Sequence, residues 1–165
     1  AKGGSAESYT QGRYEAFGPG GSLLIIDSLT DNSNRALVEI RTSITKKGGH
    51  LGSTIFNFTQ TGLFVFKGNN RDEVEENLIL SDVDVREVTE EDGSIEVLVE
   101  PSAFGQAREV LGGMGISEFD VAEITFLAND PIELTDPEDK RKFDALCDML
   151  DELQDVQNVY HNVKA

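Results

Sequence analysis

The four residues Gly18-Pro19-Gly20-Gly21 constrain the fold of this chain more than any other short stretch. Proline fixes its own φ and lacks an N–H donor, and adjacent glycines weaken any helix or strand, so these residues predict a tight turn. The apolar run 22–29 follows directly and is bounded by turn residues, and its short length favours a buried strand. The turn therefore delivers the chain into a hydrophobic core.

The same glycines are not a phosphate-binding loop. Dinucleotide-binding loops and P-loops follow a strand and open a helix, whereas this stretch precedes a strand and lacks a lysine at the Walker spacing. We therefore interpret the turn as structural.

A basic amphipathic helix is predicted over residues 31–47. Asp31-Asn32-Ser33-Asn34 offers several good N-caps, and Gly48-Gly49 provides a stop after two lysines. Apolar residues recur at helical spacing at Leu37, Ile40 and Ile44. One face of this helix should pack on the strand at 22–29 and leave its basic face exposed.

The remaining elements are predicted from periodicity and turn residues. Residues 1–12 are small and polar and indicate a linker, and 59–62 indicate a turn. Strands are predicted at 50–58, 63–66, 83–89, 94–100, 118–127 and 156–163, and helices at 71–80, 103–111 and from 137 onward.

From residue 63 the predicted order is β-α-β-β-α-β, the split β-α-β or ferredoxin-like pattern. The closing helix and strand need partners, and residues 22–66 supply them. We therefore predict an α+β protein with two ferredoxin-like α/β sandwich domains. Residues 1–64 with 130–165 form a discontinuous domain, and residues 65–129 form an acidic domain inserted into it.

Charge is distributed unevenly along a chain whose net charge is −17. Residues 1–68 hold seven basic and five acidic residues, whereas residues 69–165 hold seven basic and twenty-six acidic residues. The negative net charge argues against nonspecific binding of nucleic acid by the whole chain. Residues 1–68 are close to neutral, so a local basic patch could form there. No apolar run is long enough to span a membrane, and no signal-peptide pattern is present, so we expect a cytoplasmic location without a membrane partner.

Catalytic and metal-binding patterns are weak. His50 and His161 have no partners at metal-ligand spacing, and Cys147 lies on the apolar stripe of the last predicted helix. With one cysteine, no internal disulfide can form. The acidic turn at 90–93 lacks the alternating ligands of a calcium loop. We predict a protein that is not an enzyme, with no cofactor and no metal site.

The basic residues near the start of the chain are the one positive functional signal. We predict that they position nucleic-acid phosphates, and the alternative is an ordinary solvated helix face. No aromatic residues are interleaved with them, so reading of bases is not indicated. The predicted contacts are Arg13, Arg35, Arg41, Lys46 and Lys47.

Several strings of residues resemble the YebC family, which includes bacterial transcriptional regulatory proteins and the mitochondrial translational activator of cytochrome c oxidase subunit one. The resemblance covers residues 12–163. It is carried by the strings YEAFGPGG at 14–21, LTDNSNR at 29–35, TKKGGHLG at 45–52, DVREV at 84–88 and DVQNVYHNV at 155–163.

This resemblance implies a helical N-terminal domain followed by two α/β domains, the third inserted in the second. The chain then corresponds to the second and third domains, with the basic N-terminal domain absent. One departure is a short connection, because Leu51-Gly52-Ser53-Thr54 runs straight into the next predicted strand.

The resemblance also implies a role in gene expression. We expect a DNA-binding transcriptional regulator whose partner is nucleic acid. The alternatives are a ribosome-associated translation factor or translational activator, and, from another class, an α/β regulatory module that senses a small ligand.

Overall fold

A computed structural model describes residues 8–164, and these form an α+β protein with two four-stranded antiparallel sheets. The chain divides into two compact units. Unit 1 comprises the chain up to Thr59 together with the chain from Leu127 onward, and unit 2 is Gln60–Phe126. These limits lie three to five residues from the domain limits predicted from the sequence.

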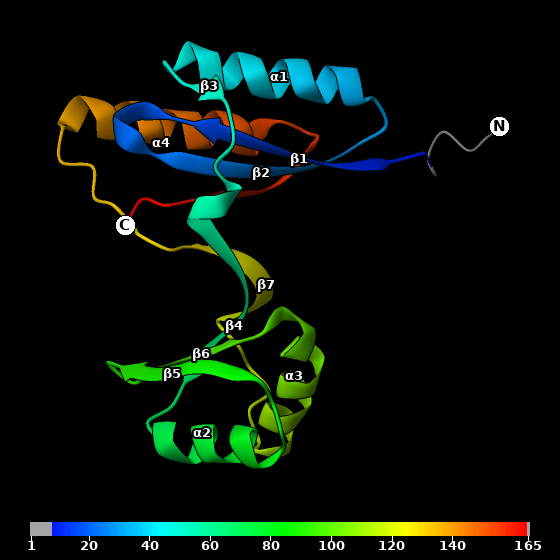
Figure 1. Ribbon diagram of the computed structural model, residues 1–165, viewed down its shortest axis with the longest axis vertical. Helices are drawn as coiled ribbons and strands as arrows, with labels where there is room; N and C mark the ends of the chain where they lie inside the picture. Colours follow the sequence, from blue (N-terminus) through cyan, green and yellow to red (C-terminus); the bar gives the residue numbers. More distant parts are fainter. Residues whose placement is uncertain (1–7, 165) are drawn as a thin grey trace. The chain divides into compact units, whose positions relative to one another are not determined.

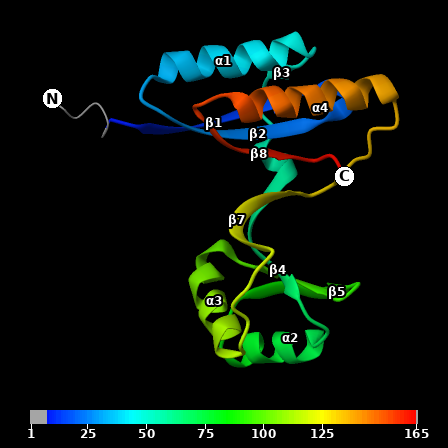
Figure 2. The ribbon, with the colours of Figure 1, turned by 180° about the vertical axis from the view of Figure 1, so that it is seen from behind.

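The sheet of unit 1 has the order β3-β1-β2-β8. Strands β1 (Thr10–Phe17) and β2 (Leu23–Thr30) form a hairpin around the glycine turn, β3 (His50–Leu51) pairs with β1, and β8 (Val156–His161) pairs with β2. Helices α1 (Ser33–Lys46) and α4 (Pro137–Glu152) lie beside each other on one face of this sheet (Figures 1 and 2).

The core of unit 1 lies between this sheet and its two helices. Strand residues on the helix-facing side meet apolar residues of both helices, and half-buried Tyr14 and Val159 pack against them. Its fully buried or nearly buried members are Ala16, Leu24, Ile26, Ile40, Ile44, Phe143, Leu146 and Leu150. The apolar stripes of α1 and α4 therefore fix which faces of these helices reach solvent.

The glycine turn also positions the start of α4. Gly20 and Gly21 have φ angles of 67° and 87°, which glycine adopts without strain. A Cβ on Gly20 would lie 2.8 Å from the Leu134 side chain and 3.0 Å from Cβ of Asp139. The turn is thus pressed against the beginning of α4, as a structural element rather than a ligand loop.

Unit 2 is a ferredoxin-like sandwich. It contains α2 (Arg71–Leu80), β5 (Val85–Glu91), β6 (Ser94–Val99), α3 (Phe104–Gly113) and all but two residues each of β4 (Phe58–Lys67) and β7 (Val121–Ala128). Its sheet has the order β5-β6-β4-β7, and its core includes Phe64, Phe66, Leu78, Leu111 and Val97. This order of elements agrees with the predicted β-α-β-β-α-β pattern.

Three local predictions were wrong. Residues 10–12, assigned to the linker, begin strand β1, whereas residues 1–7 lie outside the described part of the chain. The turn predicted at 59–62 is continuous strand within β4. Of the strand predicted at 50–58, only His50–Leu51 (β3) and Phe58, the first residue of β4, are strand, and a short 3-10 helix at Ile55–Asn57 lies between them.

Strand β1 changes the element order of unit 1 to β-β-α-β-α-β rather than β-α-β-β-α-β. The segment β2-α1-β3 is still a split β-α-β, because β1 lies between its two strands. The α+β class, with two helices and a four-stranded antiparallel sheet in each unit, is confirmed.

Candidate nucleic-acid interface

The C-terminal end of α1 presents three of the five predicted contacts. The side chains of Arg41 and Lys46 are exposed and Lys47 is half-buried. Arg41, Thr42, Thr45 and Lys46 line a shallow hollow of about 280 Å³. Asn32 caps the other end of the helix by accepting a hydrogen bond from the Arg35 amide, so the basic residues stand two to four turns from the cap.

Helix α4 adds two further cations at the same place. A second hollow of about 530 Å³ is lined by Thr45, Lys46, Lys47 and Gly48 of the α1 end and by Glu138, Arg141, Lys142 and Ala145 of α4. The C-terminal end of α1 thus lies beside the first turns of α4 (Figure 1). We call Arg41, Lys46, Lys47, Arg141 and Lys142 the α1–α4 basic patch.

One carboxylate lies within the patch. Glu138 accepts a hydrogen bond of 3.0 Å from Nη1 of Arg141, one turn away on an exposed helix surface. Exposed ion pairs of this kind contribute little to stability, and the Arg141 guanidinium stays accessible to a ligand. The hollow that contains Glu138 therefore keeps a clear excess of positive charge.

Arg13 lies away from the patch and is paired. Its Nε atom donates to Oδ1 of Asp27 at 2.7 Å across the β1–β2 hairpin. Neighbouring Tyr14 packs into the helix-covered core, so Arg13 lies on the opposite face of the sheet. The structure does not bring this predicted contact together with the residues of α1.

Arg35 is engaged at the start of α1 by three carboxylates. Its Nε and Nη2 atoms each donate to Asp155 at 3.0 Å, Nη2 also donates to Asp31 at 2.8 Å, and Glu39 lies at 3.9 Å. These hydrogen bonds hold the pKa of Asp155 below its ordinary value. Arg35 connects α1 to the residue before β8 and does not join the patch.

Arg141 and Lys142 were missed because the predicted contacts were limited to basic residues near the start of the chain. Lys140-Arg141-Lys142 is the only run of three basic residues in the sequence, and that run was the available signal. Its relation to Lys46 depends on the packing of two helices about 95 residues apart. Local patterns do not encode this relation.

The histidines and the cysteine do not form a joint site with the patch. The His50 ring stacks on Phe17 at 5.1 Å, and the His161 ring meets Phe143 edge-on at 5.0 Å. Burial, reinforced by Asp151, Asp144 and Asp148, raises the pKa of Cys147 to about 11. Within residues 8–164, no three potential metal-ligating side chains converge.

The arrangement of the patch suits binding of phosphates more than reading of bases. Four of its five charged groups are exposed, Thr42 and Thr45 lie beside them, and no aromatic residue lines either hollow. Ammonium and guanidinium groups of this kind contact backbone phosphates and set register without sequence information.

Comparison with known proteins gives the family. A family model described as the TACO1/YebC second and third domain matches residues 9–163. The chain belongs to the TACO1/YebC family. This confirms the resemblance drawn from the glycine turn and the closing strand.

Named relatives of this TACO1/YebC chain are bacterial. "Probable transcriptional regulatory protein YeeN" of Escherichia coli O157:H7 is 46% identical over 99% of this chain and 69% of the relative. The protein of the same name in Salmonella typhimurium is 45% identical over the same shares. The relatives are thus longer than the part that this chain matches.

A solved structure shares the fold. "Conserved Hypothetical Protein Aq1575" from Aquifex aeolicus superposes with a TM-score of 0.77 at 26% sequence identity. The match covers 95% of this chain and 65% of the Aquifex protein, so this chain spans about two thirds of that structure. Within residues 8–164, every helix is too short or too polar to span a membrane.

Proposed function

We propose that this protein is a regulator of gene expression that binds nucleic acid through the α1–α4 basic patch, as a DNA-binding transcriptional regulator. The proposal rests on five cations from two helices that are far apart in the sequence. These cations lie together on one surface of an acidic chain. The names of the bacterial relatives support a regulatory role. The proposal includes a cytoplasmic location and involves no catalytic step and no cofactor.

The charge of the rest of the chain shapes this proposal. Unit 2 holds four basic and sixteen acidic residues, a net charge of −12. An acidic surface of this kind repels phosphate groups, and at physiological salt the repulsion extends over roughly a Debye length of 8–10 Å. Nucleic acid should therefore approach through the patch alone, in few orientations, rather than coat the protein.

Arg13 and Arg35 remain part of the predicted contact set, but their partners argue for a lesser role. Each guanidinium already donates to at least one carboxylate at 3.0 Å or less. A phosphate would have to displace those carboxylates. We therefore assign the main contacts to Arg41, Lys46, Lys47, Arg141 and Lys142.

A ribosome-associated translation factor is the second candidate. The hollows of the patch lack aromatic residues that would stack on bases, and a grip on backbone phosphates fits structured RNA as well as duplex DNA. The same patch would then contact ribosomal RNA.

One binding experiment tests the patch and separates the candidates. Fluorescence anisotropy would measure the affinity of the protein for labelled duplex DNA and for labelled hairpin RNA. Co-sedimentation at the same salt concentration would measure its affinity for ribosomes. The variant Lys46→Ala/Lys47→Ala removes two patch charges. The matched control Lys67→Ala/Lys164→Ala removes two exposed charges elsewhere.

We expect the patch variant to bind nucleic acid about tenfold or more weakly than wild type. Each phosphate contact that is lost reduces the number of counterions that binding releases from the nucleic acid. The control should stay close to wild type. Equal losses in both variants would show that only net charge matters and would contradict the proposal. Tighter binding to ribosomes than to duplex DNA would favour the translation factor.

A further inference from the structure

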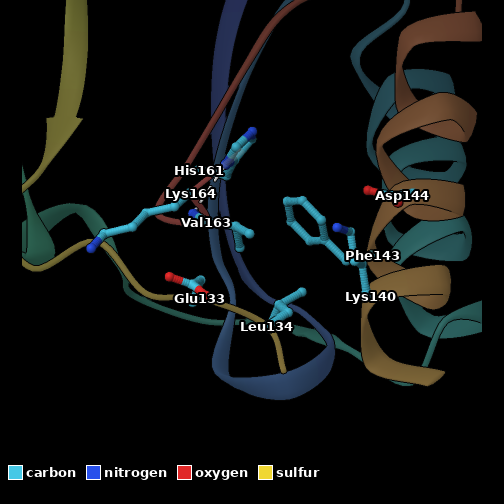
Figure 3. A pocket seen from close by; sticks show the side chains of 8 residues that line it. All are labelled: Glu133, Leu134, Lys140, Phe143, Asp144, His161, Val163 and Lys164. Carbon is cyan, nitrogen blue, oxygen red and sulfur yellow. Dashed lines mark hydrogen bonds between the residues drawn. The ribbon is translucent and has the colours of Figure 1, made fainter. Parts of the chain in front are cut away.

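A separate cavity lies on the other side of α4 from the basic patch. It has a volume of about 430 Å³, within the range of small-molecule sites. It is bounded by α4, by the segment before α4 and by the end of β8 (Figure 3). Its lining residues are Glu133, Leu134, Lys140, Phe143, Asp144, His161, Val163 and Lys164.

The base of the cavity is apolar and aromatic. The Phe143 side chain is 5% exposed and meets the His161 ring edge-on at 5.0 Å, and Leu134 and Val163 add aliphatic surface. A hydrocarbon or aromatic group placed here would leave water and contact the Phe143 ring.

The imidazole of His161 offers a fixed donor. Its Nδ1 atom accepts a hydrogen bond of 3.1 Å from the backbone N–H of Val163. This bond places the ring proton on Nε2, and partial burial lowers the pKa of His161, so the neutral form prevails at pH 7. Nε2–H then remains to donate to an acceptor.

The charges around the cavity come in two pairs of opposite sign. Lys140 and Asp144 stand on α4, whereas Lys164 and Glu133 stand on the opposing wall (Figure 3). Among the described ion pairs of the chain, none involves these four side chains. Each wall of the cavity therefore carries one cation and one anion that form no ion pair within the described part of the protein.

We propose that this cavity binds a small zwitterion with an apolar or aromatic side chain, such as a hydrophobic α-amino acid. The ligand carboxylate would meet Lys140 or Lys164 together with Nε2–H of His161. Its ammonium would meet Glu133 or Asp144, and its side chain would cover Phe143. This inference stands apart from nucleic-acid binding, because the patch residues Arg141 and Lys142 do not line the cavity.

Titration of the 165-residue chain with L-phenylalanine, followed by NMR of the His161 imidazole, tests the proposal. Two probes serve as controls: 3-phenylpropionate lacks the ammonium group, and phenethylamine lacks the carboxylate. We expect a saturable shift of the His161 signals with L-phenylalanine, and binding about tenfold or more weaker for either control, because each loses charge-assisted hydrogen bonds.

Two variants locate the site. Lys140→Gln/Lys164→Gln removes both cations of the cavity and Glu133→Gln/Asp144→Asn removes both anions. Each double variant should weaken L-phenylalanine binding about tenfold. Lys47→Gln, on the basic patch, should leave it unchanged. Both cavity variants change exposed side chains, and an unchanged melting temperature confirms folding.

Three outcomes would overturn the proposal. One is the absence of any saturable His161 shift at millimolar L-phenylalanine. Another is equal binding of the two singly charged controls and L-phenylalanine, which would indicate simple apolar adsorption. The third is unchanged L-phenylalanine binding by both cavity variants, which would place the ligand elsewhere.

Discussion

Arg35 and Asp155 lie 120 positions apart in the sequence and form a bidentate ion pair, with two N–O distances of 3.0 Å. The pair ties the first turn of α1 to the residue that precedes β8. The Asp155 side chain is only 7% exposed, whereas that of Arg35 is 44% exposed. The carboxylate is thus the buried partner, and its charge depends on the guanidinium.

Replacement of Asp155 by Asn should lower the free energy of unfolding at neutral pH. The hydrogen bonds from Arg35 hold the pKa of Asp155 below its unfolded value of about 4. Its ionised form therefore contributes stability above pH 4, and that contribution is lost as the pH falls through the folded pKa. The difference between wild type and Asp155→Asn should shrink between pH 7 and pH 3.

Urea unfolding at those two pH values measures this difference. Asp148→Asn, an exposed acid on α4, is the control and should show no comparable dependence on pH. A constant difference for Asp155→Asn across this range would mean that the ion pair does not stabilise the fold through its charge.

Gly49 should tolerate no side chain. A Cβ at this position would collide with the backbone carbonyl oxygen of Phe17 and lie 3.3 Å from Cα of Gly18. Backbone atoms cannot move aside as a flexible side chain can, so Gly49→Ala should destabilise the protein by about 1–3 kcal/mol. Thermal or chemical unfolding measures this loss.

Gly112 provides the matched control with the opposite sign. It lies in α3, has no positive φ, and a Cβ there would meet nothing within 4 Å. Gly112→Ala should therefore stabilise the protein by up to about 1 kcal/mol through better helix propensity. Equal effects of the two substitutions would contradict the close approach at Gly49.

These glycines show what the sequence could and could not predict. The turn at 18–21 and helix α1 were predicted from strong local signals, namely Pro-Gly-Gly, an Asn cap and apolar residues at helical spacing. Strand β1 was missed because its outward residues Gln11, Arg13 and Glu15 are polar and one inward position is Gly12. The alternation of inward and outward side chains along β1 becomes visible only when Arg13 is known to pair with Asp27 across the hairpin.

Strand β4 was misread for a related reason. Thr59-Gln60-Thr61-Gly62 has the composition of a turn, but Gly62 lies where a Cβ would be 2.7 Å from Val99, so close approach between strands requires glycine there. Three of the five residues of the proposed basic patch, Arg41, Lys46 and Lys47, were predicted from the local pattern of α1. Arg141 and Lys142 join them only through the packing of α4 beside α1.

Cys147 should react slowly with thiol reagents. Its pKa is raised to about 11 by burial and by the carboxylates of Asp151, Asp144 and Asp148. The thiolate fraction near pH 8 is then about a hundredfold lower than that of an ordinary cysteine. Reaction with a disulfide reagent should be slower in the folded protein by at least that factor and should recover in urea. A rate equal to that of a free thiol would contradict this environment.

In the proposed function, α1 and α4 together form one surface for phosphates. Its most direct test is the dependence of the nucleic-acid binding constant on salt, measured for wild type and for two variants. Lys46→Ala/Lys47→Ala removes the charges of α1, and Arg141→Ala/Lys142→Ala removes those of α4. On duplex DNA the slope of log K against log salt should flatten by up to about 0.9 for each lost contact. We expect a flatter slope for both variants. An unchanged slope for the α4 variant would contradict a shared surface, and an unchanged slope for both would contradict phosphate binding at this patch.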